Sequence, residues 1–250
     1  MRGIIEVEGT TADTALGACD RSNGSEVKEM EASLKQATAR MRLLPAQEQG
    51  IAPADYRRLQ YLYGEALAEL NLRISNLQRE QRLQLGRAPI HHVQTRIKTY
   101  SSICEKLTRK GYAVSIECAR DRLYDIAGMR IVCPTVEDVY DVGQALRALP
   151  GIGILRERDY IRAPKENGYR SLHVVLNMPV CTVDGARRVP VEVQVRTLAM
   201  DVWASLEHDL CYKREATCAP RTRREMQGLS RRMAEVDARL SALRRETELS

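Results

Sequence analysis

The strongest constraint on the fold is the strict alternation of side chains in residues 189–197, VPVEVQVRT. Successive side chains of a strand point to opposite faces, so Glu192, Gln194 and Arg196 share one face and the valines share the other. Taken alone, this pattern is typical of a half-exposed antiparallel strand whose outer face is in contact with solvent. The same pattern is also compatible with a strand whose polar face forms a functional site, and the other predicted strands bear on that choice.

Two further runs predict strands. They are GMRIVC at 128–133 and RSLHVVLNM at 170–178, and both are rich in β-branched residues. Between them, residues 136–149 carry apolar side chains at helical spacing, and Pro150 and Gly151 end that helix. Helices interleaved with strands predict an α/β or α+β sheet domain.

Helical patterns flank this predicted sheet. Residues 26–85 are rich in helix formers and are interrupted by Pro45, Gly50 and Pro53, which predicts two helices. In the second, an apolar stripe recurs from Tyr56 to Leu77, and we expect it to pack on its own domain rather than on another molecule. After Thr197, Leu198, Val202, Leu206 and Leu210 lie four apart, as in an amphipathic helix.

The carboxyl-terminal helix, predicted over 221–248, has a coiled-coil rhythm that covers fewer than three heptads. We favour a subunit contact there over docking on its own chain. The repeating positions are Met226, Leu229, Met233, Val236, Leu240 and Leu243. Residues 1–25 lack periodicity and predict a flexible tail, and 26–250 predict a single domain.

Composition limits the class of protein. The net charge of +6 suits phosphate-bearing ligands without demanding nucleic acid. No apolar stretch approaches the ~20 residues that span a bilayer, so we expect a cytoplasmic protein without a membrane partner. The seven cysteines are scattered without CxxC spacing, and His91 and His92 are adjacent. We therefore expect neither a disulfide framework nor a zinc site, and any metal should be held by carboxylates.

Three more segments could carry chemistry. After the turn-rich residues 164–168, Tyr169 and His173 share one strand face, where an aromatic ring can stack on a base and Lys165 can meet phosphate. The alternative is a tyrosine packed in the core and a lysine in solvent. Asp125 precedes a strand edge and could hold Mg²⁺, or could simply form a turn.

A basic segment supplies the third. Residues 96–110 contain five Lys or Arg residues, about twice the share expected from the overall composition. Ser102 can cap a helix over 103–110, and the amino end of that helix would attract an anion. A solvated basic helix face is the alternative reading.

The order and the amino-acid sequences of these segments resemble the synthetase domain of the RelA/SpoT family, and most closely its stand-alone small alarmone synthetases. The resemblance covers about residues 53–245, and the first 50 residues match nothing in that family. Its specific motifs lie within 96–213. They are Arg96-Ile97-Lys98 with Ser102-Ile103, DIAGMRI, PKENGYRSLH, PVEVQVRT and MDVWASLEHDLCYK.

The resemblance implies an α+β domain with a mixed, nucleotidyltransferase-like sheet. It implies transfer of the β,γ-pyrophosphate of ATP to the 3′-hydroxyl of GDP or GTP, which gives AMP and ppGpp or pppGpp. Mg²⁺ would be organised by Asp125 and Glu192, and Glu192 could also remove the hydroxyl proton. ATP would contact Arg96, Lys98, Ser102, Lys106 and Arg130; the acceptor would contact Lys165, Asn167, Tyr169, His173 and Gln194.

Three alternatives stay open. Some toxin-like relatives transfer the same group to the 3′ end of tRNA. A non-catalytic RNA-binding module would use the basic face but would leave Asp125 and Glu192 unexplained, because carboxylates repel a phosphate backbone. A purely structural assembly protein would use only the terminal helices. We expect a homo-oligomer formed through those helices, with a tetramer as one candidate, and RNA binding is not expected as the main role.

Overall fold

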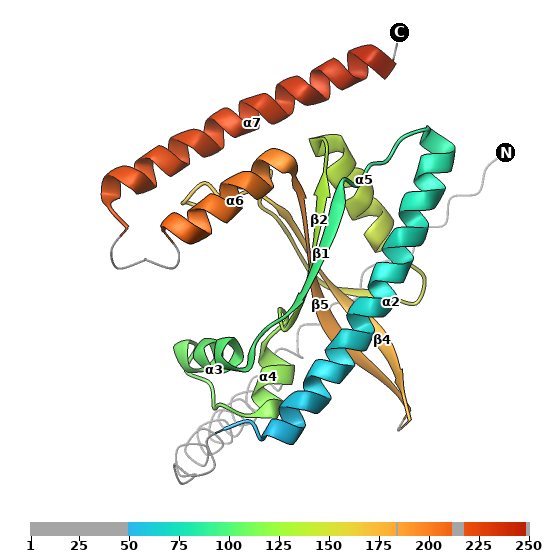
Figure 1. The fold of residues 1–250 in the computed structure, drawn as a ribbon, viewed down its shortest axis with the longest axis vertical. Helices are drawn as coiled ribbons and strands as arrows, with labels where there is room; N and C mark the ends of the chain where they lie inside the picture. Colours follow the sequence, from blue (N-terminus) through green and yellow to red (C-terminus); the bar gives the residue numbers. More distant parts are fainter. Residues whose placement is uncertain (1–49, 184, 212–217, 249–250) are drawn as a thin grey trace, which may run out of the picture. The chain divides into compact units, whose positions relative to one another are not determined.

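The computed structural model describes residues 50–183, 185–211 and 218–248, which belong to one unit spanning residues 50–250. At its centre is a five-stranded sheet of order β1-β2-β5-β4-β3 (Figure 1). The strands are β1 His92–Ile97, β2 Ala127–Cys133, β3 Gly153–Asp159, β4 Leu172–Thr182 and β5 Gly185–Thr197. The helices are α2 Pro53–Leu85, α3 Tyr100–Arg109, α4 Ile116–Arg122, α5 Val136–Arg147, α6 Leu198–Leu210 and α7 Pro220–Glu248.

The sheet is mixed, as the resemblance implied. β2 and β5 run parallel, and the other neighbouring strands run antiparallel. The three strands expected from the sequence are β2, β4 and β5, whereas β1 and β3 were not expected. The predicted tail (1–25) and the first predicted helix lie outside the described residues, so the domain boundaries remain a prediction.

One face of the sheet is covered by α2 and α5. The second predicted helix is α2, and its apolar stripe packs on this sheet: Leu70 and Ile74 are at most 1% exposed. Val142 of α5 and Val193 of β5 belong to the same buried cluster. The chain has no phenylalanine, so this core is mainly aliphatic. Burial of these side chains is the main stabilising contribution to the described unit.

The pair α6–α7 lies at one end of the sheet, where α6 directly continues β5 (Figure 1). The buried side chains of α6 are Met200 and Trp203, and the Trp203 ring nitrogen donates to the backbone oxygen of Met226 in α7 at 2.8 Å. The inner side of α7 is largely polar, with Ser230 and Asp237 buried. Of the apolar stripe predicted on α7, Met226 is buried on this inner side, whereas Leu229, Val236, Leu240 and Leu243 are exposed. The α6 stripe of Leu198, Val202, Leu206 and Leu210 is exposed as well.

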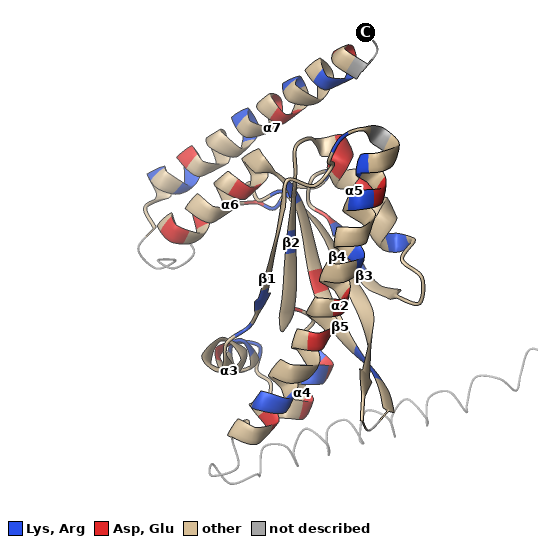
Figure 2. Cartoon of the chain, turned by 45° about the vertical axis from the view of Figure 1, so that its right-hand side comes forward, with Lys and Arg blue, Asp and Glu red and all other residues tan. Residues whose placement is uncertain are grey.

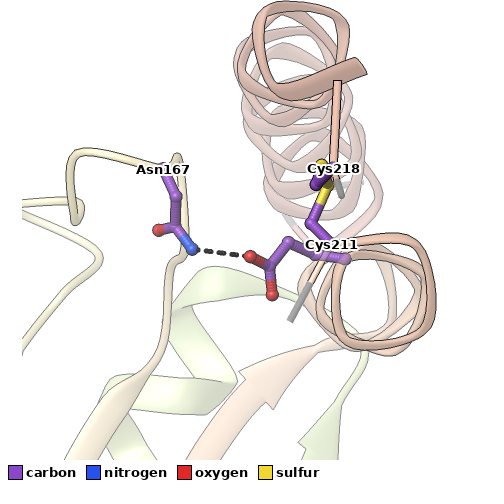
Figure 3. Close-up of a disulfide and its surroundings, with 4 residues drawn as sticks. Asn167, Cys211 and Cys218 are labelled. Atoms are coloured by element: carbon purple, nitrogen blue, oxygen red, sulfur yellow. Dashed lines mark hydrogen bonds between the residues drawn. A yellow bond between two sulfur atoms is a disulfide. The ribbon is translucent and has the colours of Figure 1, made fainter. Parts of the chain in front are cut away.

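A disulfide joins Cys211, at the end of α6, to Cys218, just before α7 (Figure 3). No disulfide framework was expected from the sequence, and this single bridge was not predicted. The spacing matches no motif, but α6 and α7 pack against each other and bring the two positions together. Cys104, Cys118, Cys133 and Cys181 are free. None of the helices in the described ranges combines the length and apolar character needed to cross a bilayer.

Candidate active site

The strand register aligns polar side chains on the sheet face opposite α2 and α5. One row across the sheet joins Arg96, Gly128 and Glu192 on β1, β2 and β5. The next row joins Gln94, Arg130, Gln194 and His173 across β1, β2, β5 and β4. The alternation first seen in residues 189–197 thus gives one apolar face and one face of charges and amides.

A cleft of about 900 Å³ opens over this polar face. All twelve residues that the resemblance proposed as a site line it, although they come from five elements and the loops beside them. They are Arg96, Lys98, Ser102, Lys106, Asp125, Arg130, Lys165, Asn167, Tyr169, His173, Glu192 and Gln194. The structure therefore brings every expected site residue together, while the role of each stays a prediction.

Asp125 and two lysines form the centre of one side of the cleft. The Nζ atoms of Lys98 and Lys106 lie 2.9 and 2.5 Å from Oδ2 of Asp125. Burial alone would raise the pKa of Asp125, but the charges and hydrogen bonds of the two lysines outweigh it and hold that pKa below its ordinary value. The carboxylate is ionised, and it fixes the ammonium groups of Lys98, just after β1, and of Lys106 in α3. Figure 2 colours Lys and Arg positions blue where β1 leads to α3.

The second oxygen of Asp125 fits a cation ligand. Oδ1 is buried and has no hydrogen-bond partner among the described residues. Glu192 lines the same cleft and also a smaller adjoining pocket with Asp125. In the described residues, no group of three or more His, Cys, Asp or Glu is arranged so that it could hold a metal ion. Mg²⁺ commonly binds one or two carboxylates together with substrate phosphates. Two carboxylates therefore suit Mg²⁺ better than they suit zinc.

Glu192, His173 and Tyr169 are linked on the other side of the cleft. The Tyr169 hydroxyl lies 2.7 Å from Nε2 of His173, and Nδ1 of His173 lies 3.5 Å from Oε1 of Glu192. Burial would raise the pKa of Glu192, but the hydrogen bonds and charge of His173, with a hydrogen bond from Gln194, hold it below its ordinary value. Glu192 is therefore an ionised, proton-accepting group.

Arg196 joins this network at the Tyr169 hydroxyl. Nη2 of Arg196 donates to the Tyr169 oxygen at 2.7 Å. Burial raises the pKa of Tyr169, which keeps the proton on the phenol oxygen. The same oxygen lies within hydrogen-bond distance of Nε2 of His173, whose Nδ1 faces Glu192, so the network connects Arg196 to Glu192 across the cleft.

The loop before Tyr169 is docked on α6 and α7. Nδ2 of Asn167 donates to Oε1 of Glu207 at 3.0 Å, beside the disulfide (Figure 3). Gly168 has φ 97°, and a Cβ there would lie 3.0 Å from Cβ of Ser230, so only glycine suits this close approach. Lys165 extends back over the Tyr169 ring, 4.7 Å from its centroid.

One local expectation was wrong. Helix α3 begins at Tyr100, and its cap is Thr99, whose side chain accepts from the backbone nitrogen of Ser102. Ser102 is thus inside the first turn rather than at the cap, although it still lines the cleft. Thr99 and Ser102 are both residue types that commonly cap helices. The first turn of this helix is exposed and has few apolar residues, so the sequence did not indicate which of the two is the cap.

Other cleft residues were not proposed as site residues from the sequence. Arg196 is 4% exposed and lies on the same strand face as Glu192, which the alternation already indicated. Side chains of α6 also reach the cleft, and they could be placed there only once the helix was known to follow β5 directly. The additional lining residues are Glu105, Arg109, Arg196, Ala204, Ser205, Glu207, His208 and Asp209.

The fold and cleft together define an α+β protein with a phosphate-handling site, in which cations and ionised carboxylates share one sheet face. Residues 95–217 match the family model described as the region found in RelA / SpoT proteins. The GTP pyrophosphokinase YwaC of Bacillus subtilis is 40% identical over 159 residues, 64% of this chain and 76% of YwaC. YjbM of the same organism, also a GTP pyrophosphokinase, is 35% identical over 74% of this chain and 87% of YjbM.

Solved structures agree with these matches. Small alarmone synthetase 1 from Bacillus subtilis has a TM-score of 0.71 at 34% identity, covering 78% of this chain and 98% of that one. A GTP pyrophosphokinase family protein from Streptococcus pneumoniae has a TM-score of 0.72 at 32% identity, covering 78% and 96%. The chain belongs to the RelA/SpoT family and is similar to its small alarmone synthetases.

Proposed function

We propose that this protein transfers the β,γ-pyrophosphoryl group of ATP to the ribose 3′-hydroxyl of GDP or GTP and releases AMP and ppGpp or pppGpp. The observation that carries the proposal is the single cleft in which lysine-bound Asp125 and ionised Glu192 lie between a basic segment and the Tyr169–His173 pair. Two GTP pyrophosphokinases are among the relatives, and a solved small alarmone synthetase 1 is bound to its product pppGpp.

The donor nucleotide is assigned to the side formed by β1, β2 and α3. Lys98 and Lys106 are compact positive charges held in place by Asp125, which suits the phosphates. Arg96 and Arg130 flank them on β1 and β2, where a planar guanidinium can stack on adenine as well as bind phosphate. Ser102, in the first turn of α3, adds a hydroxyl at the amino end of that helix.

The acceptor is assigned to the side formed by β4, β5 and the loop before Tyr169. Tyr169 is the guanine-stacking ring, and Lys165 and Asn167 lie on the same loop. His173 and Gln194 hold the Glu192 carboxylate through hydrogen bonds, the latter at 2.8 Å. Glu192 is thus oriented to accept the proton of the 3′-hydroxyl as its oxygen attacks the β-phosphorus of ATP.

The transfer is a single displacement. A bond forms between the 3′-oxygen and the β-phosphorus, the bond from that phosphorus to the α,β-bridging oxygen breaks, and AMP carries away the electron pair. Phosphoryl transfer leaves the protein little covalent work, so positioning and charge neutralisation dominate. A Mg²⁺ ion held by Asp125 and Glu192 would neutralise charge developing on the transferred group. No enzyme-bound intermediate is expected.

The outward apolar stripes support assembly into a homo-oligomer. Eight side chains on α6 and α7 are 41–52% exposed, and such exposed rows commonly mark protein contacts. They are Leu198, Val202, Leu206 and Leu210 on α6, and Leu229, Val236, Leu240 and Leu243 on α7. Light scattering on a Val236→Asp variant tests this: an unchanged mass excludes a role for α7. The number of subunits and a cytoplasmic location stay predictions.

The decisive experiment incubates the purified protein with Mg²⁺, ATP labelled at the β- and γ-phosphates, and GDP, GTP or deacylated tRNA. Label should move to GDP or GTP, and AMP should appear in equal amount. Label found only on tRNA would assign a different acceptor to the same chemistry. Loss of label as inorganic phosphate, without transfer, would reject the proposed reaction.

A further inference from the structure

Arg130 and Arg196 serve different sides of the cleft but share one anion. Oδ1 of Asp201, in the first turn of α6, lies 3.2 Å from Nη1 of Arg130 and 3.2 Å from Nη1 of Arg196. Arg130 belongs to the donor side, and Arg196 holds the hydroxyl of Tyr169 on the acceptor side. A single carboxylate oxygen therefore connects the two nucleotide subsites.

The position of Asp201 separates it from the residues that touch substrate. Arg130 and Arg196 line the cleft, whereas Asp201 is not among the residues that line it. Its side chain is 17% exposed, and its Oδ1 contacts both guanidinium groups. Asp201 can therefore act only through the arginines.

The local charge balance explains why this anion is needed. Burial and the nearby charges of Arg196 and Arg96 all lower the pKa of Arg130, and the charge of Asp201 opposes them. Three guanidinium groups thus crowd one region of the sheet face. Nε of Arg130 and Nε of Arg196 are buried without a hydrogen-bond partner in the described part of the chain. The guanidinium groups also donate to neutral oxygens, Arg130 to Gln94 and Arg196 to Tyr169 and Gln194, so Asp201 is the negative charge that the two arginines share. Without Asp201 they would repel each other and move apart.

We infer that Asp201 is a positioning residue that holds Arg130 for ATP and, through Arg196, Tyr169 for the guanine nucleotide. This inference rests on the proposed function. It predicts that one substitution outside the cleft weakens both substrates together, which no residue of a single subsite should do. Because one group orders both subsites, binding of either nucleotide should also favour binding of the other.

The test uses Asp201→Asn, which keeps the side-chain shape and removes the charge. The matched control is Asp55→Asn, the same change in the first turn of α2, where Asp55 is exposed. Dissociation constants are measured separately for GDP and for a non-hydrolysable ATP analogue. Both should rise roughly tenfold in Asp201→Asn, the scale of one charge-assisted hydrogen bond, and neither should change in Asp55→Asn.

Several outcomes separate the explanations. If only one affinity falls, or neither, while the variant is folded, Asp201 does not join the subsites. If Asp201→Asn fails to fold, Asp201→Glu retains the charge and should bind both nucleotides; loss of either affinity in that folded variant overturns the inference. Product formation by the wild type is measured in parallel. An inactive wild type rejects the proposed function, whereas an active wild type with an unaffected Asp201→Asn rejects only this inference.

Discussion

The two faces of the sheet differ in burial and in charge, although the same strands form both. The face under α2 and α5 is aliphatic and almost fully buried. The face under the cleft carries ionised carboxylates, partly buried lysines and a nearly buried arginine. Because side chains alternate along each strand, one face stabilises the fold and the other forms the candidate site. Substitutions on the buried face should therefore change stability, and substitutions on the cleft face should change activity.

The largest effect is expected for Glu192→Gln on the cleft face. The amide keeps the shape but cannot accept the 3′-hydroxyl proton, so kcat should fall by about 10²–10⁴. The midpoint of thermal unfolding should stay near that of the wild type, because no buried apolar contact is lost. Steady-state synthesis rates and calorimetry on the same preparation measure both quantities.

The matched control for this variant is Glu157→Gln on β3. Glu157 pairs with Arg147 away from the cleft, so the same chemical change should leave synthesis unaltered. Normal turnover by Glu192→Gln would remove the proposed proton acceptor, and a large loss in Glu157→Gln would show that the two faces are not separable.

The reverse behaviour is expected for Leu70→Ala on the buried face. Leu70 is 0% exposed against the sheet, and such truncations cost about 2–5 kcal/mol of unfolding free energy. Activity per folded molecule should be unchanged. Denaturant unfolding and active-site titration measure the two effects, with Leu72→Ala as the control because Leu72 is 55% exposed on the same helix. A loss of kcat in the folded Leu70→Ala protein would break the comparison.

The sequence was most informative where pattern and fold coincide. Strands β2, β4 and β5 are buried on one face, so their alternation or β-branched content was visible, and the family motifs placed all twelve expected residues in one cleft. Edge strand β3, GILRERD, was missed because it is almost entirely exposed and carries no apolar periodicity. Edge strand β1, HVQTRI, was missed because it has only two apolar residues, Val93 and Ile97, which pack partly buried against the core. Burial produces the signal that sequence patterns detect, and edge strands have little of it.

Contacts between distant segments were harder to foresee. Asp201 was visible as one polar position on a helix, but its pairing with Arg130 depends on how α6 leaves β5. The Cys211–Cys218 bond likewise depends on how α6 and α7 pack against each other, which no spacing rule describes. Such features are set by tertiary geometry rather than by local periodicity.

A smaller effect is expected when this disulfide is removed by Cys218→Ser. Closing a loop with a sequence separation of 7 constrains the unfolded chain by about 2.5 kcal/mol at most. Because α6 and α7 hold the loop of Asn167, the KM for the acceptor should rise while the KM for ATP stays constant. Denaturant unfolding and steady-state kinetics test this against Cys181→Ser, an exposed free cysteine. Equal changes in both KM values would contradict an effect of the disulfide that is confined to the acceptor side.

The smallest effect is expected from mild acid, and it tests whether the cleft carboxylates are as strongly ionised as their contacts imply. The pKa values of Asp125 and Glu192 lie below their ordinary values of 3.8 and 4.5. Groups lowered in this way add stability above their unfolded pKa, and that stability is lost only as the pH falls through the lower folded value. Neither carboxylate should therefore protonate between about pH 7 and 5, and kcat/KM should show no acid limb from them in that range.

The measurement is the pH profile of kcat/KM of the wild type between about pH 7 and 5. A limb near pH 6 would mean that burial outweighs the hydrogen bonds and cations around the two carboxylates. The cleft face would then disfavour charged side chains, as the buried face does. The contrast between the two faces would not hold at Glu192, the residue on which the proposed reaction depends.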